Sequence, residues 1–273
     1  MKLTYYGTAA GEGWPGLFCG CALCRAAREQ GGKNIRTRSQ ALVDDDLLLD
    51  LPPDTYMHSL VYGLDLTRVR YLLITHSHSD HCAAEDIELL REPYSHTCAG
   101  IEVYGNERVR EKIVRATGND GGEAERFHYH VAQPNRPYAV GGYTVTPLRA
   151  THDRNELCLF YHIEKGGKSI LYAHDTGALT PENLNCLMSL PRPLSLVSLD
   201  CTMMRARDGN NHMGLLDAAE QKEKLLQLGI ADEHTVWVVN HFSHNGGWLH
   251  EELCEQAEKY GFLAAYDTME ITF

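Results

Sequence analysis

The sequence predicts one α/β domain of layered sheets, and three observations lead to this fold class. Short apolar runs typical of strands alternate along the chain with stretches of helical spacing. One run, residues 69–74, is almost continuously apolar, as expected for a strand buried on both faces. No repeat, low-complexity tract or clear linker interrupts the 273 residues, so we expect a single domain over residues 1–273.

The expected strands are short apolar runs, and recognisable turns bound several of them. The first strand enters a glycine-rich turn at residues 7–13. An acidic turn separates two short runs that look like paired strands, and Lys-Gly-Gly-Lys at residues 165–168 is the expected turn of a hairpin. We expect strands at residues 2–6, 41–43, 47–49, 69–74, 101–104, 143–148, 158–164, 169–172, 194–199 and 235–239.

Three stretches have the spacing of helices. In residues 107–116, Val109, Ile113 and Val114 share one face. Residues 215–228 are amphipathic, whereas the polar, glycine-rich residues 118–122 are expected to form a loop. We expect helices at residues 83–91, 107–116 and 215–228.

Composition limits the classes of function. The net charge of −12, from 25 basic and 37 acidic residues, argues against a broad nucleic-acid-binding surface but not against a small anionic substrate. No apolar run approaches the roughly 20 residues needed to cross a bilayer. Because the first residues lack the features of a signal peptide, we expect a cytoplasmic protein. The sequence does not define an oligomeric state, and a homodimer would be unsurprising.

The densest chemical signal is a cluster of four residues: His76, His78, Asp80 and His81. Imidazole nitrogens and carboxylate oxygens are ligand types that suit zinc, manganese and iron, so the metal's identity stays open. His76 and His78 alternate along an extended segment and should project to the same side. Asp80 and His81, at the turn into a helix, can serve a second ion. A solvated, histidine-rich loop is the alternative, although this pattern is rare by chance.

Four residues cannot fill two metal sites, so further ligands should follow other strands. His152, Asp175 and His241 each come within four residues of the end of an apolar run, which is where α/β proteins place their sites. Taken alone, His152 or His241 could equally be a structural histidine.

In this order, the cluster and the three later residues resemble the metallo-β-lactamase superfamily. The resemblance spans nearly the whole chain and implies a four-layered αββα sandwich with a two-metal site. It implies one metal on His76, His78 and His152 and the other on Asp80, His81 and His241, with Asp175 bridging them. We assign Asp80 to the catalytic residues as well as to the metal ligands.

The cysteines near the N-terminus indicate a second kind of metal site. Cys19, Cys21 and Cys24 form a Cys-x-Cys-x-x-Cys loop, and three thiolates need a fourth donor to close a tetrahedral structural zinc. His244, three residues after His241, is the best candidate. Three reduced surface thiols are the alternative. The remaining cysteines are expected to be mostly ordinary buried residues: Cys82, Cys98, Cys158, Cys186, Cys201 and Cys254.

The cysteine loop narrows the resemblance to the phosphoribosyl cyclic phosphodiesterase of phosphonate breakdown and its relatives. That branch combines such a loop with a Gly-Thr turn, here at Gly7, and a His-x-Ser-His segment, here beginning at His241. It also has a C-terminal Asp-Gly-Met-Glu-Ile segment, in which Thr268 replaces the glycine here. Residues 202–204 lack the family's Ser-His-Pro-Pro, and residues 118–137 match no family pattern.

The resemblance implies a phosphodiesterase that acts on a small or cyclic diester by attack of a metal-bridging hydroxide. His212, in the Asn-His context of the family, would be a general acid or a donor to the phosphate, unless it is a solvated loop histidine. Three alternatives stay open. They are a hydrolase of lactones, thioesters or β-lactams, a nuclease of the tRNA 3′-end-processing kind, and a non-catalytic binding protein like the PQQ-biosynthesis member.

Overall fold

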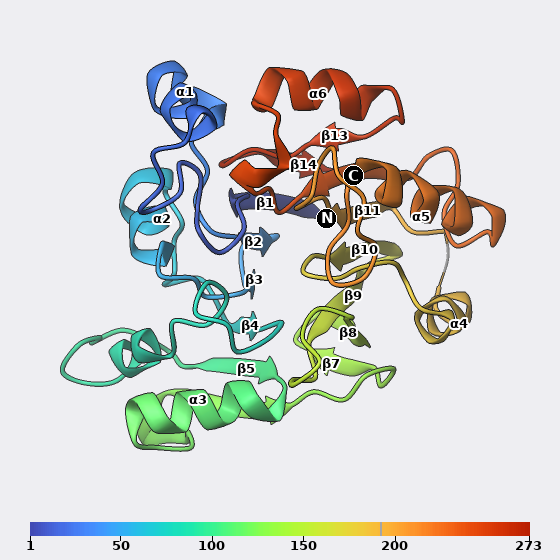
Figure 1. Ribbon diagram of the computed structural model, residues 1–273. Coiled ribbons are helices and arrows are strands. Elements are labelled where there is room, and N and C mark those ends of the chain that lie inside the picture. Colours follow the sequence, from blue (N-terminus) through green and yellow to red (C-terminus); the bar gives the residue numbers. More distant parts are fainter. Residues whose placement is uncertain (192) are drawn as a thin grey trace.

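The computed structural model describes residues 1–191 and 193–273, in which two sheets of seven strands pack face to face with helices outside both. Figure 1 shows α2 and α3 against the first sheet and α4 and α5 against the second. Tyrosine hydroxyls cross between the sheets: Tyr5 donates to Ser198 Oγ at 2.8 Å and Tyr161 to the Ile74 carbonyl at 2.7 Å. The predicted α/β sandwich is therefore confirmed.

The first sheet comes from the N-terminal half of the chain, completed by the last strand. Strands β3 to β6 run parallel to one another, so their C-terminal ends lie at one edge. In order across the sheet, the strands are β14 (Glu270–Thr272), β1 (Lys2–Gly7), β2 (Gln40–Val43), β3 (Leu47–Leu49), β4 (Tyr71–Leu73), β5 (Ile101–Gly105) and β6 (Phe127–Val131).

The second sheet comes from the C-terminal half. Strands β10 to β13 are parallel, and β8 runs in their direction because both β8 and β10 are antiparallel to β9. In order, the strands are β13 (Leu263–Ala264), β12 (Val236–Asn240), β11 (Leu196–Asp200), β10 (Lys168–Ala173), β9 (Leu159–Lys165), β8 (Tyr143–Arg149) and β7 (Tyr138–Val140).

The helices cover the outer faces and ends of the sheets. The α-helices are α1 (Ala22–Gln30), α2 (Thr55–Tyr62), α3 (Glu107–Thr117), α4 (Pro181–Ser189), α5 (Leu215–Gln227) and α6 (His250–Glu258). Four short 3-10 helices are η1 (Gly32–Asn34), η2 (Ala84–Leu90), η3 (Glu123–Glu125) and η4 (His244–Gly246). Within the described ranges, no helix is both long and apolar enough to span a membrane.

Burial on both faces explains the continuous apolar runs. In β3, Leu47 and Leu49 belong to the central core, whereas Leu48 belongs to a second cluster beneath the helices. Likewise Leu73 of β4 faces the central core and Leu72 the outer cluster. Since side chains alternate along a strand, a strand between two apolar layers needs apolar residues at every position.

All ten predicted strands occur, with ends that differ by a few residues. Only Tyr71–Leu73 of the expected strand at 69–74 pairs as a strand, and the expected helix at 83–91 is the 3-10 helix η2. Residues 118–137, for which we recognised no pattern, contain η3 and the edge strand β6. Of the six remaining cysteines, Cys82, Cys158 and Cys201 are buried and the other three are half-buried.

Candidate metal centre

The predicted metal ligands gather where the strands of both sheets end. His76 lies just beyond β4, and His152, Asp175 and His241 follow β8, β10 and β12 at a shared edge of the second sheet. Asp175 and His241 leave their strands in the left-handed backbone region, with φ of 48° and 66°. This conformation is costly for residues other than glycine, and such strain concentrates at functional sites.

One group of potential ligands consists of His76, His78 and His152. One nitrogen from each ring lies within 4.8 Å of the others, and His78 Nδ1 is 3.3 Å from His152 Nε2. His76 is buried and His152 is half-buried, whereas the side chain of His78 is 42% exposed. The structure thus brings together the three histidines expected for one metal, and they line a site that is open to solvent through His78.

A second group consists of Asp80, His81 and His241, again within 4.8 Å of one another. Asp175 lies between the groups. Its Oδ2 is 2.6 Å from His81 Nε2 and 3.1 Å from His241 Nε2, and its Oδ1 is 3.8 Å from His152 Nε2. The two oxygens of this one carboxylate therefore face the two groups, as the bridging assignment requires.

The buried histidines are held by their second nitrogens. His81 Nδ1 is 2.7 Å from Asp50 Oδ2, His76 Nδ1 is 2.9 Å from Thr75 Oγ, and His241 Nδ1 is 2.8 Å from Thr202 Oγ. Such partners at Nδ1 fix the orientation of an imidazole and leave Nε2 as the free ligand atom. The site therefore has the outer support that metal-binding histidines need.

The free atoms fit a divalent cation. Four buried polar atoms in this region have no hydrogen-bond partner: His76 Nε2, His81 Nε2, Asp175 Oδ2 and His241 Nε2. The short contacts among them lack the angles of hydrogen bonds. Buried polar atoms without partners are rare, and cations bound to the two groups would satisfy all four. Burial alone would raise the pKa of Asp175, but His241 and His81 hold it well below its ordinary value, so this carboxylate is ionised as a ligand must be.

His212 lies beside both groups. Its ring centroid is 4.8 Å from that of His152 and 5.9 Å from that of His241. Its Nδ1 is 3.1 Å from Oδ2 of Asp200, the buried last residue of β11. Burial alone would lower the pKa of His212, but the Asp200 carboxylate reverses this and raises it to about 9. An imidazolium at this place can donate a proton or hydrogen-bond an anionic substrate.

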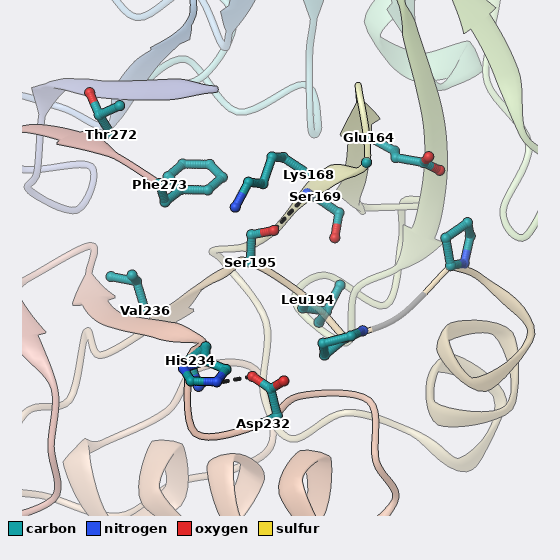
Figure 2. A pocket seen from close by; sticks show the side chains of 13 residues that line it. Glu164, Lys168, Ser169, Leu194, Ser195, Asp232, His234, Val236, Thr272 and Phe273 are labelled. Carbon is teal, nitrogen blue, oxygen red and sulfur yellow. Dashed lines mark hydrogen bonds between the residues drawn. The ribbon is translucent and has the colours of Figure 1, made fainter.

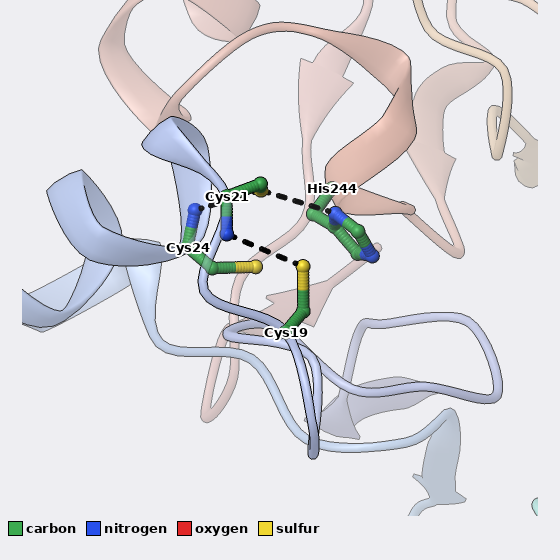
Figure 3. Close-up of side chains that lie close together, drawn as sticks. All are labelled: Cys19, Cys21, Cys24 and His244. Carbon is green, nitrogen blue, oxygen red and sulfur yellow. Dashed lines mark hydrogen bonds between the residues drawn. The ribbon is translucent and has the colours of Figure 1, made fainter.

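The cysteine loop forms a separate cluster (Figure 3). Thiols of Cys19, Cys21 and Cys24 and a ring nitrogen of His244 lie within 4.8 Å of one another. The backbone N–H of Cys24 lowers the pKa of the Cys21 thiol to about 6, whereas burial raises the pKa of Cys24 to about 11. Three thiols and one imidazole converging from two distant segments are the donor set of a tetrahedral zinc site.

A short loop connects this cluster to the other ligands. Glu12 Oε1 is 2.5 Å from the hydroxyl of Ser243 and 3.6 Å from His244 Nε2. A Cβ on the preceding Gly11 would lie only 2.9 Å from Asp80 Oδ2, so only glycine fits there without a shift. The loop thus contacts both the cysteine cluster and a predicted catalytic ligand.

Reasoning from the sequence missed several residues of the site. Asp50 and Asp200 orient His81 and His212, and Thr202 contacts His241. A usable signal existed for the two carboxylates, because each comes at the end of a mostly apolar run, residues 47–49 for Asp50 and residues 196–199 for Asp200. Thr202 carries no such signal, since its role depends on its distance from a residue 39 positions later.

The described residues also enclose a cavity of about 440 Å³ away from these groups (Figure 2). Its lining includes Lys168, Ser195 and Val236, which stand at the starts of β10, β11 and β12. The predicted metal ligands lie at the opposite ends of the same parallel strands. This cavity is therefore no part of the candidate metal centre.

The layered fold and the histidines and aspartates at its strand ends define a metal-dependent hydrolase. The chain belongs to the β-lactamase superfamily, because the model of the β-lactamase superfamily domain matches residues 47–232. The expected superfamily membership is thus confirmed.

Solved structures with the same fold include a diphosphatase of the PhnP family, with a TM-score of 0.76, 23% identity, and coverage of 100% of this chain and 97% of that chain. Zn²⁺-bound PqqB from Methylobacterium extorquens has a TM-score of 0.74 and 18% identity, with full coverage of both chains. The short form of human tRNase Z has a TM-score of 0.65 and 18% identity, covering 100% of this chain and 99% of that chain. At these identities the likeness concerns the fold.

Among curated proteins, an octanoyltransferase from Porphyromonas gingivalis (strain ATCC BAA-308 / W83) is 26% identical over 208 residues. The match covers 69% of this chain and 37% of that protein. The chain therefore corresponds to about a third of the length of this relative, and the name of the whole relative does not transfer to it.

Proposed function

We propose that this protein is a two-metal phosphodiesterase that hydrolyses a small or cyclic phosphodiester. The observation that carries the proposal is His212, an imidazole paired with Asp200 and placed beside both groups of metal ligands. The intact ligand set favours catalysis over a binding role. A diphosphatase and a tRNase among the proteins of the same fold support phosphorus chemistry.

The proposed metals are zinc or manganese, with iron as a third candidate, one on each group of ligands and Asp175 shared between them. When bound, two divalent cations lower the pKa of water and neutralise charge on phosphoryl oxygens. Asp50, Thr75 and Thr202 would keep the ligand histidines oriented through their Nδ1 atoms. A third, structural zinc would lie on the cysteine cluster.

His212 would supply the proton that the leaving oxygen needs. The Asp200 carboxylate raises the pKa of His212, which favours the protonated ring, and fixes that ring through Nδ1. An alkoxide or ribosyl oxygen is a poor leaving group and gains from a proton donor, whereas p-nitrophenolate leaves without one. A carbonyl substrate would depend much less on this residue.

The test is His212→Ala assayed on two diesters. Turnover of an alkyl or ribosyl cyclic diester should fall by about 10²–10⁴-fold, the usual contribution of a general acid, and that of a p-nitrophenyl diester much less. His234→Ala, at a solvent-exposed histidine, is the control and should change neither rate. Equal losses on both diesters would instead place His212 on the phosphoryl oxygens as an electrostatic donor.

One observation favours a second candidate, hydrolysis of an acyl substrate such as a thioester. The curated relative is named for transfer of an octanoyl group, although this chain matches about a third of it. The same metal groups could serve attack on a carbonyl carbon. Under this alternative, His212→Ala would leave turnover of an activated thioester nearly unchanged, and phosphodiesters would not be hydrolysed.

A further inference from the structure

Ser77 stands between the two ligands His76 and His78, and one carboxylate holds both its backbone and its side chain. The Ser77 N–H donates to Glu156 Oε1 at 2.8 Å, and the Ser77 hydroxyl donates to Glu156 Oε2 at 2.7 Å. Both oxygens of the Glu156 carboxylate therefore accept hydrogen bonds from the same residue of the ligand segment.

Glu156 belongs to the loop between β8 and β9, four residues after His152. Its hydrogen bonds to Ser77 therefore join the two segments that supply the first group of ligands. Two further contacts join the same segments: His78 Nε2 lies 3.4 Å from Asp153 Oδ2, and the Leu159 N–H donates to the Thr75 carbonyl at 2.9 Å. Among the described residues, Glu156 alone holds Ser77, the residue between the two ligand histidines, by both backbone and side chain.

Side chains of α3 and its N-cap donate hydrogen bonds to both partners of this contact, Glu156 and the segment of Ser77. Asn106, the N-cap of α3, donates from Nδ2 to Glu156 Oε1 at 2.7 Å and to the Leu157 carbonyl at 2.8 Å. From the same helix, Lys112 Nζ donates to the carbonyl of Ser77 at 2.9 Å and to that of Cys82 at 2.7 Å. Helix α3 and its N-cap thus hold both the carboxylate and the ligand segment.

We propose that Glu156 is a positioning residue that sets the spacing of His76, His78 and His152. It belongs to none of the metal-ligand groups found among the described residues, so it would act through Ser77 rather than on a metal. Ligands held in place before a metal arrives lose less conformational freedom on binding, and partners that orient ligands typically contribute about 10–100-fold to metal affinity. The proposal concerns metal binding and does not depend on the substrate.

The test measures Mn²⁺ affinity by competition with a chromogenic chelator, without substrate. In a His241→Ala background, which leaves only the first group complete, Glu156→Ala should weaken binding by about 10–100-fold. In a His152→Ala background, which leaves the second group complete, it should have little effect. Glu233→Ala, at an exposed glutamate, is the matched control and should change neither affinity.

Glu156→Gln should restore affinity to within about threefold of the parent, because an amide oxygen can still accept from Ser77 N–H and the Ser77 hydroxyl can turn to accept from the amide. Ser77→Ala removes only the hydroxyl hydrogen bond to Glu156 and should weaken Mn²⁺ binding to the first group by a smaller factor. This variant keeps the proposal testable if Glu156→Ala does not fold. Unchanged affinity in both Glu156→Ala and Ser77→Ala, or equal weakening of both groups, would overturn the proposal even if the melting temperature fell.

Discussion

At the scale of single residues, the Asp267 carboxyl lies in a buried chain of hydrogen bonds that fixes where a proton sits. Both Nε2 hydrogens of Gln40 are donated to other oxygens, so its Oε1, 2.6 Å from His58 Nδ1, accepts from that nitrogen. Burial lowers the pKa of His58 to about 4, and the neutral ring then accepts at Nε2 from the Thr37 hydroxyl, 2.7 Å away. The Thr37 hydroxyl thus has one hydrogen for two neighbours, His58 Nε2 and Asp267 Oδ2, both 2.7 Å away, and a protonated Asp267 would relieve this competition.

Burial raises the pKa of Asp267 to about 6, although hydrogen bonds from Thr8 and Thr37 and the nearby Arg36 lower it. The folded protein binds this proton more tightly than the unfolded chain does. The stabilisation is therefore complete below about pH 4 and is lost as the pH rises through 6, and a shift of about two pKa units corresponds to roughly 3 kcal/mol.

Asp267→Asn should remove this pH dependence. Relative to the wild type, the free energy of unfolding of the variant should rise by up to about 3 kcal/mol between pH 4 and pH 7. Denaturant titrations of both proteins at several pH values give this difference, in which the titration of the metal ligands cancels. A difference that stays constant, or that falls with pH, would show that Asp267 is ionised in the folded protein.

Single residues also differ in whether their role in the site could be predicted from the local sequence. The cluster from His76 to His81 was recognisable because its ligands are close in sequence and their types are unusual together. Glu156 was not, since its role depends on the folded distance to Ser77, 79 positions earlier. Thr268 was noted only as a replacement for the family's glycine, and it adopts φ of 73°, a conformation that glycine enters without cost.

At the scale of elements, the strands of the sandwich interior were predictable, whereas several helices and edge strands were not. Helix α1 buries only Cys24 and Ala27, so it has no apolar stripe to recognise. In α2 the apolar Tyr56, Leu60 and Val61 are exposed, which obscures any amphipathic pattern. Strand β6 is an edge strand in which only Phe127 is buried. Buried faces leave a periodic signal in the sequence, and exposed elements leave little.

The cysteine loop and α1 depend on each other. The Cys21 thiol accepts from the Cys24 backbone N–H and caps α1, while the Cys21 Sγ lies 3.6 Å from His244 Nδ1. A metal on this cluster would tie α1 to the segment that follows β12. Because such a metal would bind the folded protein, it would add to the free energy of unfolding, by about 2.7 kcal/mol at a hundredfold excess over its dissociation constant.

Cys21→Ser should therefore lower the melting temperature by about 5–10 °C, given about 2–4 °C per kcal/mol for a domain of this size. Metal analysis should find about three metals per chain in the wild type, one on each group of ligands and one on the cysteines, and about two in the variant. Cys186→Ser, outside the cluster, is the control. An unchanged melting temperature with unchanged zinc content would contradict the assignment.

At the scale of the whole molecule, the site forms only because two sheets align their strand ends. The first sheet brings Asp50 and His76, and the second brings His152, Asp175 and His241. The resemblance to a known superfamily predicted this arrangement, whereas periodicity alone predicted layered sheets without their relative placement. The alignment also explains why Asp80 and His241, 161 positions apart along the chain, lie in the same group of ligands.

The net charge of −12 is a property of the same scale. A surface with this excess of acidic groups repels polyanions over long distances, so a small diester is a better match than a long nucleic acid. Cations bound at the strand ends would supply positive charge only within the site. This is our reason for placing cyclic phosphodiesters ahead of RNA among the candidate substrates.

The most direct test of the central claim is a comparison of kcat/KM across substrate classes for the metal-loaded protein. The panel contains a ribose cyclic phosphate, bis-p-nitrophenyl phosphate, a cyclic nucleotide, a lactone, a thioester, nitrocefin and a tRNA precursor. We expect the small or cyclic phosphodiesters to be hydrolysed best, with activity lost on chelation and restored by Zn²⁺ or Mn²⁺. Efficient cleavage of the thioester, lactone or nitrocefin with no cleavage of any phosphodiester would contradict the proposed function.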